Sequence, residues 1–380
     1  MKKIVRITTV STSLRILLKG QLRYMNRYFD VVAISSKEGF QEVLQEQGVR
    51  GYVVEMTRKI TPFKDLISLF QLVRILLKEK PDIVHTHTPK AGLLGMLAAW
   101  IVRVPNRLHT VAGMPLLVAT GNKRRLLDFM EKLTYACATK VYPNSFVMMD
   151  IIVSLKLAPF NKLKVIAQGS SNGIDTSYFS VQNTLPKEDL RCRWGIGTMD
   201  FVFVFVGRIV KDKGVNELVR SFVLLKSSYE NIKLLLVGGF ERELDPLAKD
   251  VEEKIDKDNS IITVGHQSDV RPFFSVADVL VFPSYREGFP NVVLQAGTMK
   301  LPSIVTDING CNEIIQDGVN GKIILPRDEG ALYNMMKWFY EHRNDEVKKM
   351  AERARPMIIE RYEQHKVWEA LLKEYCSLDK

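Results

Sequence analysis

Residues 201–214 read FVFVFVGRIVKDKG. The alternating phenylalanines and valines form a continuous run of aromatic and β-branched side chains, which predicts a strand buried on both faces. The run ends at Gly207 and Arg208, and an amphipathic helical pattern begins after Lys213 and Gly214. A buried strand that passes through a glycine-containing loop into a helix is typical of a parallel α/β sheet.

The same alternation of strand and helix patterns continues on both sides of this stretch. In the second half of the chain, further strands are expected at residues 232–238, 261–264, 279–282 and 303–305. In the first half, they are expected at residues 4–10, 31–35, 52–55, 82–87, 107–111, 140–143 and 164–167. The pattern predicts an α/β protein with two doubly wound, Rossmann-like domains that face each other across a cleft.

The length of 380 residues also favours two domains over one. Small residues at 169–173 and a polar stretch at 180–187 are the candidate linkers. We therefore expect an N-terminal domain at 1–180 and a C-terminal domain at 181–380. The last helical pattern, at 364–375, is expected to reach back to the N-terminal domain.

The two halves differ in charge. Residues 1–180 contain 26 Lys and Arg against 12 Asp and Glu, a net charge of +14, whereas residues 181–380 contain 28 against 31, a net charge of −3. A basic half suits nucleic acid, an anionic membrane surface or a phosphate-bearing substrate, and a merely solvated basic surface stays open as an alternative. No nucleic-acid-binding motif accompanies the charge, so we expect no nucleic acid partner.

Cysteine spacing and hydropathy indicate the compartment. The four cysteines lie far apart and form no C-x-x-C pair, which argues against a disulfide framework and a structural zinc site. The chain has the basic start of a signal peptide, but Arg6 interrupts the apolar run and no small-residue cleavage site follows, so we expect a first strand instead. The most apolar stretch, residues 91–102, is shorter than the roughly 20 residues that span a bilayer. A cytoplasmic protein without a transmembrane helix is expected.

Ligands of open parallel sheets bind beyond the carboxyl ends of the strands, so the loops there are the candidate sites. In the first such loop, Gly207 precedes Arg208, and Lys213 precedes the next helix. Two cations beside a helix N-terminus suit a diphosphate. Two ordinary surface cations near a turn are the alternative.

A second loop, PSYREGFPN at residues 283–291, follows another apolar strand. Gly288 permits close approach of a ligand to the backbone, and Pro290 and Asn291 suit the start of a helix whose free N–H groups bind oxygen atoms. Glu287 is a hydrogen-bond acceptor for sugar hydroxyls. A simple turn at the strand–helix junction is the alternative.

The first half offers weaker candidates. Residues 82–92, DIVHTHTPKAG, place His85 and His87 on the same face of a strand, without a third histidine at metal-ligand spacing. For His85, a structural role is the alternative. Ser13 lies after the first strand, where hydroxyls suit donor binding, and the absence of G-x-G-x-x-G argues against a nicotinamide-dependent dehydrogenase. Residues 114–127 join apolar side chains to Lys123, Arg124 and Arg125, which suits an anionic membrane surface or, alternatively, a core helix.

The spacing of Gly207-Arg208, Lys213-Gly214, Glu287-Gly288-Phe289-Pro290 and Gln295 resembles the retaining glycosyltransferases of family four, which have the GT-B fold. The similarity extends over essentially the whole chain and suggests the bacterial capsular or O-antigen type. It implies that Arg208 and Lys213 bind the diphosphate of the donor and that Glu287 binds sugar hydroxyls. Gln295 stands where the family has a second glutamate, and its amide can still bind the ribose. The implied donor site is Gly207, Arg208, Lys213, Glu287, Gly288, Phe289, Pro290, Asn291 and Gln295.

The resemblance also assigns roles in the first half. It places His87 and Lys90 at the acceptor cleft, in reach of acceptor or donor oxygens, and His109 near a position that is often histidine and is Ala112 here. Residues 305–313 resemble the family's next donor-side loop, with a tight Asn-Gly turn as the alternative. In this chemistry the departing phosphate can accept the acceptor's proton, so the resemblance does not require a protein base.

The expected activity is transfer of a hexosyl or N-acetylhexosaminyl unit from a nucleotide diphosphate sugar, preferably UDP-linked, to a hydroxyl of a lipid-linked saccharide. Arg208, Lys213 and Glu287 are the expected catalytic residues, and neither a metal nor another cofactor is expected. The enzyme is expected at the inner face of the cell membrane as a peripheral protein. The alternatives are an inverting transferase, a UDP-sugar epimerase and a non-catalytic nucleotide-sugar-binding subunit.

Overall fold

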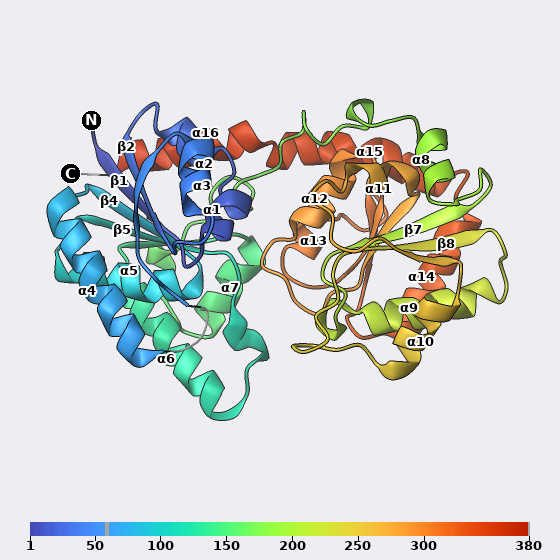
Figure 1. Cartoon of the computed structure of the whole chain (residues 1–380), viewed down its shortest axis with the longest axis horizontal. Coiled ribbons are helices and arrows are strands. Elements are labelled where there is room, and N and C mark those ends of the chain that lie inside the picture. The colour runs from blue at the N-terminus through green and yellow to red at the C-terminus, as the bar shows by residue number, and fades with distance from the viewer. Residues whose placement is uncertain (58–60, 379–380) are drawn as a thin grey trace. The chain divides into compact units, whose positions relative to one another are not determined.

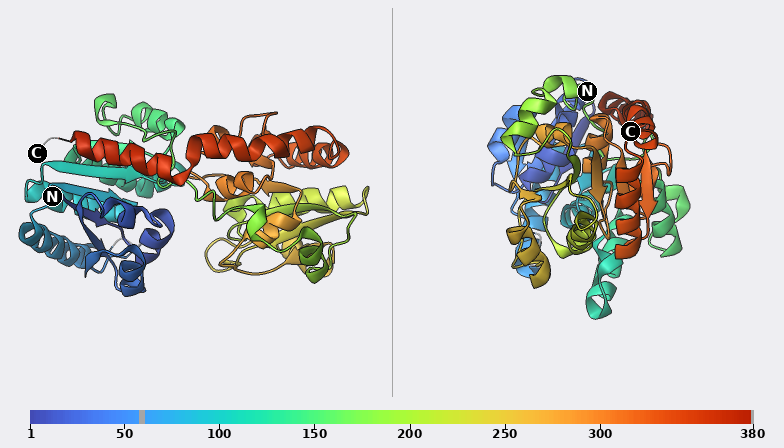
Figure 2. Two further views of the ribbon diagram at one scale, coloured as in Figure 1. Left: turned by 90° about the horizontal axis from the view of Figure 1, so that it is seen from above. Right: turned by 90° about the vertical axis from the view of Figure 1, so that its right-hand side faces the viewer.

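A computed structural model of the protein describes residues 1–57 and 61–378. The chain divides into two compact units, the first formed by Met1–Gly173 with Gln364–Lys380 and the second by Ile174–Glu363 (Figure 1). The division falls at the small-residue loop 169–173 rather than at residue 180, and the last helix is part of the first unit. In each unit, helices cover a layer of strands on both sides (Figure 2).

The first unit contains a six-stranded parallel sheet in the order β3-β2-β1-β4-β5-β6. Its strands are β1 Lys3–Ile7, β2 Asp30–Ser35, β3 Arg50–Val53, β4 Ile83–His87, β5 Asn106–Val111 and β6 Lys140–Pro143. Its helices are α1 Ser11–Leu17, α2 Gln21–Met25, α3 Phe40–Gln47, α4 Pro62–Glu79, α5 Pro89–Ile101, α6 Gly121–Cys137, α7 Phe146–Ser154 and α16 Gln364–Ser377, with short 3₁₀ turns at Pro115–Val118 and Phe160–Lys162. This strand order is that of the doubly wound Rossmann fold.

The two faces of this sheet carry separate cores, because successive strand residues point to opposite sides. Val5 and Ile7 pack with residues of α4, α5, α6 and α7. Ile4 packs on the other side with residues of α1, α2, α3 and α16. Both chain ends lie in this unit, where the Lys2 ammonium donates a 2.6 Å hydrogen bond to the carbonyl of Leu378. Helix α16 is therefore part of the helical layer on one face of the first unit's sheet.

The second unit repeats the topology, with the order β12-β11-β10-β7-β8-β9. Its strands are β7 Phe201–Val206, β8 Ile232–Val237, β9 Ile261–Thr263, β10 Val279–Phe282, β11 Ser303–Thr306 and β12 Gly321–Ile324. Its helices are α8 Lys187–Arg193, α9 Val215–Lys226, α10 Lys249–Lys257, α11 Arg271–Val276, α12 Asn291–Thr298, α13 Cys311–Ile314, α14 Glu329–Glu341 and α15 Glu346–Tyr362, with 3₁₀ turns at Val181–Asn183 and Lys211–Lys213. Every residue of β7 is buried, as its apolar run predicts.

One expected strand is absent, and one strand was not expected. Residues 164–167 form no strand: only Leu163 bridges to Val141, and Ala167 adopts a left-handed conformation that a strand cannot contain. Strand β12 was not expected, because Gly-Lys-Ile-Ile is a short, half-buried edge segment with little apolar periodicity. The predicted α/β class and doubly wound architecture are confirmed in both units.

Candidate active site

The two loops singled out in the second half meet at the carboxyl ends of neighbouring strands. Strand β7 pairs with β10, so the loop after Val206 lies beside the loop after Phe282. Gly214 has a φ of 69°, and a Cβ placed on it would lie only 2.1 Å from the carbonyl oxygen of Pro283. A glycine is therefore required where the 207–214 loop crosses the end of β10.

Lys213 and Glu287 come together at this crossing. The Lys213 ammonium forms an ion pair with the Glu287 carboxylate, and both side chains are largely shielded, at 14% and 16% exposure. The Ser284 hydroxyl donates a 3.0 Å hydrogen bond to the same carboxylate. The structure thus brings Lys213, which was predicted to bind the diphosphate, into contact with Glu287, which was predicted to bind the sugar.

A third loop fixes the Glu287 segment. The Asn309 amide donates hydrogen bonds to the carbonyl oxygens of Glu287 and Gly288, at 2.7 and 2.8 Å. The Thr306 hydroxyl donates to the carbonyl of Ser284. Sequence reasoning gave no roles to Ser284, Thr306 and Asn309. Their positions in the sequence could have identified them as candidates, because each is a polar residue at or just after the carboxyl end of β10 or β11.

Two less polar side chains, Phe282 and Cys311, also lie near this pair. The Lys213 ammonium lies 5.8 Å from the centre of the Phe282 ring. Cys311, at the start of α13, is fully buried nearby. Burial, followed by the negative charge of Glu287, raises the pKa of the Cys311 thiol well above its ordinary value, so this cysteine is a neutral packing residue.

Arg208 lies in a second group of charges at the same strand ends. Its guanidinium donates a 2.6 Å hydrogen bond to Glu241 and lies 3.9 Å from Asp212. Arg286, from the Glu287 loop, also contacts Asp212, at 2.9 Å. Asp212 thereby links the two loops, and the Arg208 side chain stays about half exposed, at 47%.

The helix after the Glu287 loop starts as expected. Pro290 is the N-cap of α12 and Asn291 its first residue. Gln295 lies one turn along the helix, on the same face as Asn291. Phe289 instead packs edge-on against Tyr362, with ring centroids 5.4 Å apart, so its side chain contributes to packing within the unit.

In the first unit, His85 and His87 occupy one buried cluster. Their ring centroids are 4.3 Å apart. The Arg6 guanidinium, itself 1% exposed, contacts His87 Nε2 at 2.9 Å and donates to the Tyr375 hydroxyl at 2.9 Å. His85 contacts the Tyr375 and Thr110 hydroxyls. Burial, followed by neighbouring positive charge, lowers the pKa of both histidines well below the ordinary value, so both rings are neutral at pH 7.

His109 lies on the opposite face of this sheet. Strand β5 is regular, with His109 opposite Thr86 and Thr110 opposite His87 in the register with β4. The His109 ring contacts the Thr86 hydroxyl at 2.8 Å, and a Cβ on Gly92 would lie 2.4 Å from it. The structure therefore does not bring His87 and His109 together, since adjacent positions of a strand point to opposite faces.

Lys90 and Ser13 have separate surroundings. The Lys90 ammonium binds both carboxylate oxygens of Asp65, at 2.7 and 2.9 Å, and its side chain is 8% exposed. Ser13 lies half-buried on α1, where its backbone N–H donates to the carbonyl of Val10. Neither contacts the histidine cluster through a described hydrogen bond.

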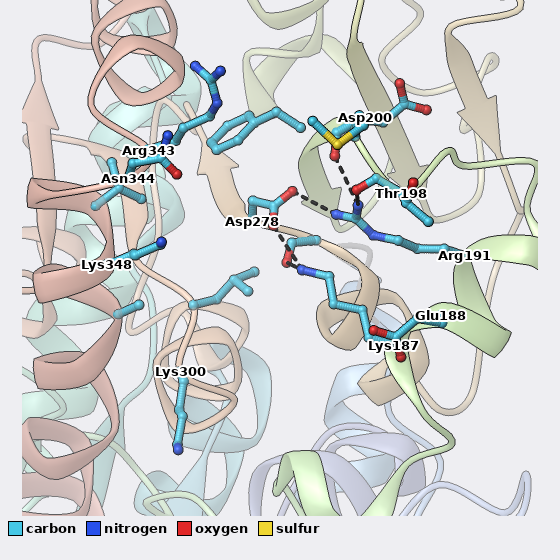
Figure 3. Close-up of a pocket in the computed structure, with 16 residues that line it drawn as sticks. Lys187, Glu188, Arg191, Thr198, Asp200, Asp278, Lys300, Arg343, Asn344 and Lys348 are labelled. Atoms are coloured by element: carbon cyan, nitrogen blue, oxygen red, sulfur yellow. Dashed lines mark hydrogen bonds and ion pairs between the residues drawn. The ribbon is translucent and has the colours of Figure 1, made fainter.

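A separate pocket of about 440 Å³ lies at the other end of the second sheet (Figure 3). Asp200 and Asp278 line it immediately before β7 and β10 begin. Asp278 accepts from Lys187 and Arg191, both at 2.8 Å, so these charges brace the amino ends of the strands. Ligands of such sheets bind at the carboxyl ends, so we place the candidate site at Lys213 and Glu287 instead.

Within residues 1–57 and 61–378, no group of three or more His, Cys, Asp or Glu side chains is arranged to hold a metal ion. In the same residues, no helix has both the length and the apolar character needed to cross a bilayer.

Comparison with known proteins identifies the family. The family described as glycosyl transferases group 1 matches residues 186–357, and the glycosyl transferase 4-like domain matches residues 22–169. A Staphylococcus aureus relative, the capsular polysaccharide biosynthesis glycosyltransferase CapM, is 33% identical over 98% of this chain and 97% of its own.

A second relative and a solved structure extend the comparison. An Escherichia coli protein named UDP-Gal:alpha-D-GlcNAc-diphosphoundecaprenol alpha-1,3-galactosyltransferase is 28% identical over 82% of this chain and 80% of its own. The Anabaena protein HepE, solved in complex with UDP, has a TM-score of 0.82 at 18% identity and covers 100% of both chains. At that identity the structural likeness shows the fold alone. The chain therefore has the GT-B fold and belongs to the family-four glycosyltransferases, among those of the capsular polysaccharide type.

Proposed function

We propose that this glycosyltransferase moves a sugar from a UDP-sugar to a hydroxyl of a lipid-linked saccharide, with retention of the anomeric configuration. The observation that carries the proposal is the contact between Lys213 and Glu287 at the carboxyl ends of β7 and β10. One loop supplies a cation for a diphosphate, and the other supplies a carboxylate for sugar hydroxyls. A nucleotide diphosphate sugar contains both groups, joined at the anomeric carbon.

The observed contacts leave N–H groups of Lys213 and Arg208 available to bind the nucleotide sugar. An ammonium has three N–H donors, so Lys213 can keep Glu287 while it binds a phosphate oxygen. A guanidinium has five, and Arg208 uses one on Glu241. The backbone N–H groups at the start of α12 add partial positive charge. These groups oppose the negative charge that develops on the diphosphate as the glycosidic bond breaks.

In the proposed reaction, the acceptor oxygen forms a bond to the anomeric carbon while the bond from that carbon to the UDP oxygen breaks. The acceptor attacks the face of the sugar from which the phosphate departs, so the configuration is retained. The acceptor's proton passes to that departing phosphate. This route requires no base from the chain and no metal ion, because Arg208 and Lys213 supply the positive charge. Glu287 orients the sugar through its hydroxyls.

Donor and acceptor classes are inferred from relatives. The Escherichia coli relative's name specifies UDP-Gal and a diphosphoundecaprenol acceptor, and HepE was solved with UDP. We assign acceptor binding to the first unit, because its residues 1–173 and 364–380 contain 29 Lys and Arg against 14 Asp and Glu, a net charge of +15 that suits a diphosphate-linked lipid. His87 and Lys90 are the candidate contacts there. We further propose that the enzyme works in the cytoplasm, at the inner face of the cell membrane.

The test is a transfer assay with purified protein. A thermal-shift screen of nucleotide sugars comes first, since a donor at 100 times its Kd adds about 2.7 kcal/mol of stability. The donor found is then incubated with a short-chain polyprenyl diphosphate saccharide, and the product's anomeric configuration is read by NMR. A retained configuration is expected. An inverted product would contradict the proposed chemistry, and tight binding without turnover would contradict the proposed activity.

A further inference from the structure

One face of helix α4 carries a row of exposed apolar side chains. Its inner face buries Ser68, Leu72 and Leu76. At 100° per residue, the opposite face presents Phe63, Ile67, Phe70 and Leu77, with Leu66 at its edge. Phe63 is 88% exposed and Phe70 62% exposed. We call these five residues, Phe63, Leu66, Ile67, Phe70 and Leu77, the outer stripe of α4.

Isolated exposed apolar residues are ordinary, but a row of them along one helix face marks a docking surface. The row follows helical spacing over most of an 18-residue helix. Because the inner face already packs against the core of the first unit, the outer stripe is not needed to fold the helix.

The charges beside the outer stripe indicate the partner. Lys64, Arg74 and Lys78 are exposed on α4. The two acids of the helix are directed elsewhere: Asp65 binds Lys90, and Glu79 is buried against Arg50 and Lys3. All the exposed charged residues of α4 are therefore cations. Lys64 and Lys78 lie beside the outer stripe, whereas Arg74 lies on the same face between Phe70 and Leu77, with its guanidinium 5.9 Å from the centre of the Phe70 ring. An apolar helix face that carries cations within it and beside it is the pattern of a helix that lies in the interface of an anionic membrane.

Helix α6, on the other side of α5, also exposes an apolar side chain between cations. Helices α4 and α6 both pack against α5 in the layer on one face of the sheet (Figure 1). On α6, Phe129 is 62% exposed. Exposed Arg125 and Lys132 lie one turn before and nearly one turn after it on the same face.

We propose that the outer stripe of α4, with Phe129 of α6, is the surface that docks this enzyme on an anionic lipid bilayer. The apolar side chains enter the acyl boundary while Lys64, Arg74 and Lys78 contact lipid phosphates. Docking in this way keeps the first unit at the membrane surface that carries a lipid-linked acceptor. The biological purpose of the surface rests on the proposed function, but the lipid binding itself does not.

The test is vesicle flotation of the full chain. Vesicles contain phosphatidylcholine alone or with phosphatidylglycerol, at low and high salt. The unmodified protein is expected to float with the anionic vesicles and to dissociate as salt rises. The double substitution I67Q/F70Q is expected to lower the bound fraction at least about tenfold. R74Q/K78Q is expected to remove the preference for phosphatidylglycerol.

The matched control is M199Q/L244Q, which removes two apolar side chains of the second unit that are 82% and 80% exposed. This variant is expected to float like the unmodified protein. Thermal unfolding checks that each variant is folded, and all six positions are exposed, so little change is expected. Equal flotation of I67Q/F70Q and the control would overturn the proposal.

A second measurement separates lipid from protein as the occupant. Substitution F70W is expected to give a blue shift in fluorescence with anionic vesicles and quenching by brominated lipid. If light scattering instead shows a dimer that I67Q/F70Q converts to a monomer without any effect on flotation, the stripe binds a second copy and the proposal is wrong. Transfer to a short-chain, water-soluble acceptor should be unchanged in I67Q/F70Q. Loss of flotation with that activity intact supports docking, whereas absence of transfer in every variant counts against the proposed function alone.

Discussion

Lys213 and Glu287 carry opposite charges and contact each other, yet the proposed chemistry assigns them to different parts of one donor. The pair is shielded from solvent and further bonded by Ser284. An ion pair held in this way has a defined geometry before the donor arrives. Pre-organised charge of this kind lowers the barrier because it need not reorient during the reaction.

The first prediction concerns Glu287. The substitution Glu287→Gln keeps a hydrogen-bonding group beside Ser284 but removes the negative charge, so sugar orientation should suffer while the diphosphate contacts remain. We expect kcat to fall by about 100-fold, with the affinity for UDP changed by less than about threefold. Steady-state kinetics and calorimetry measure the two effects. Glu253→Gln, at an exposed position of α10, is the matched control. An equal loss of UDP affinity and kcat in Glu287→Gln would argue against a role in the sugar subsite.

The second prediction concerns the buried histidines of the first unit. Burial lowers the pKa of His109 to about 4, and the pKa values of His85 and His87 are lowered as well. In the unfolded chain these groups titrate near 6.5, so below that pH the unfolded state binds more protons. The free energy of unfolding should therefore be constant above pH 6.5 and fall between about pH 6.5 and pH 4.

Urea unfolding at a series of pH values checks this dependence. His109→Gln removes one of the three groups and should make the decline shallower. His266→Gln replaces an exposed histidine of the second unit and should leave the decline unchanged. A free energy of unfolding that stays flat from pH 7 to pH 4.5 would contradict the assignment of neutral, buried rings.

At the scale of an element, the third prediction concerns the crossing of the two donor loops. Gly214→Ala puts a Cβ against the carbonyl of Pro283 and forces a left-handed alanine. We expect a loss of about 2–4 kcal/mol in stability, or displacement of the Lys213 loop with weaker UDP binding. Gly265→Ala is the matched control, because Gly265 has nearly the same φ, 68°, with nothing within 4 Å of its Cβ position. That variant should lose only about 1–2 kcal/mol. Equal losses in the two variants would show that the contact with Pro283 is unimportant.

Strands of the sheet interior could be predicted from the sequence, and so could the edge strands β3, β6 and β9, but the edge strand β12 could not. The run 201–206 is apolar at every position because both its faces are buried, and that signal is local. Residues 321–324 form a strand because β11 offers a partner, and their sequence has no such signal. Residues 164–167 have suitable side chains, but the chain turns away at Ala167.

The candidate site likewise has features that could be predicted from the sequence and features that could not. Arg208, Lys213 and Glu287 could be placed together because parallel strand order brings successive strand ends to one edge. The bonds from Asn309 and the ion pair of Lys90 with Asp65 depend on loop paths that no sequence pattern specifies. The opposite orientation of His87 and His109 depends on the register between β4 and β5, which only the structure shows.

At the scale of the whole molecule, the last helix links the end of the chain to its start. Trp368 donates a 2.7 Å hydrogen bond to Asn172, and Tyr375 accepts from Arg6 of β1. Glu374 is 3% exposed and accepts from Lys140, Lys164 and Tyr142. Although burial raises the pKa of Glu374, these hydrogen bonds hold it below its ordinary value, so the carboxylate stays charged.

The fourth prediction is that truncation after Glu363 destabilises the first unit selectively. It removes Trp368, Leu371 and Tyr375 from the core on one face of that sheet and leaves Arg6 without its hydroxyl partner. Limited proteolysis should then degrade residues 1–173 while a fragment near 174–363 persists, because the second unit has its own core. Mass spectrometry identifies the surviving fragment. Equal degradation of both units would contradict the division.

The most direct test of the central claim compares the affinities for UDP and UMP by titration calorimetry, with and without Lys213. If Lys213 binds the diphosphate, Lys213→Ala should weaken UDP binding by more than about tenfold and reduce the UDP-to-UMP affinity ratio by a similar factor. Lys249→Ala, at an exposed position of the same unit, should leave both affinities unchanged. An unaltered affinity for UDP in Lys213→Ala would contradict the account.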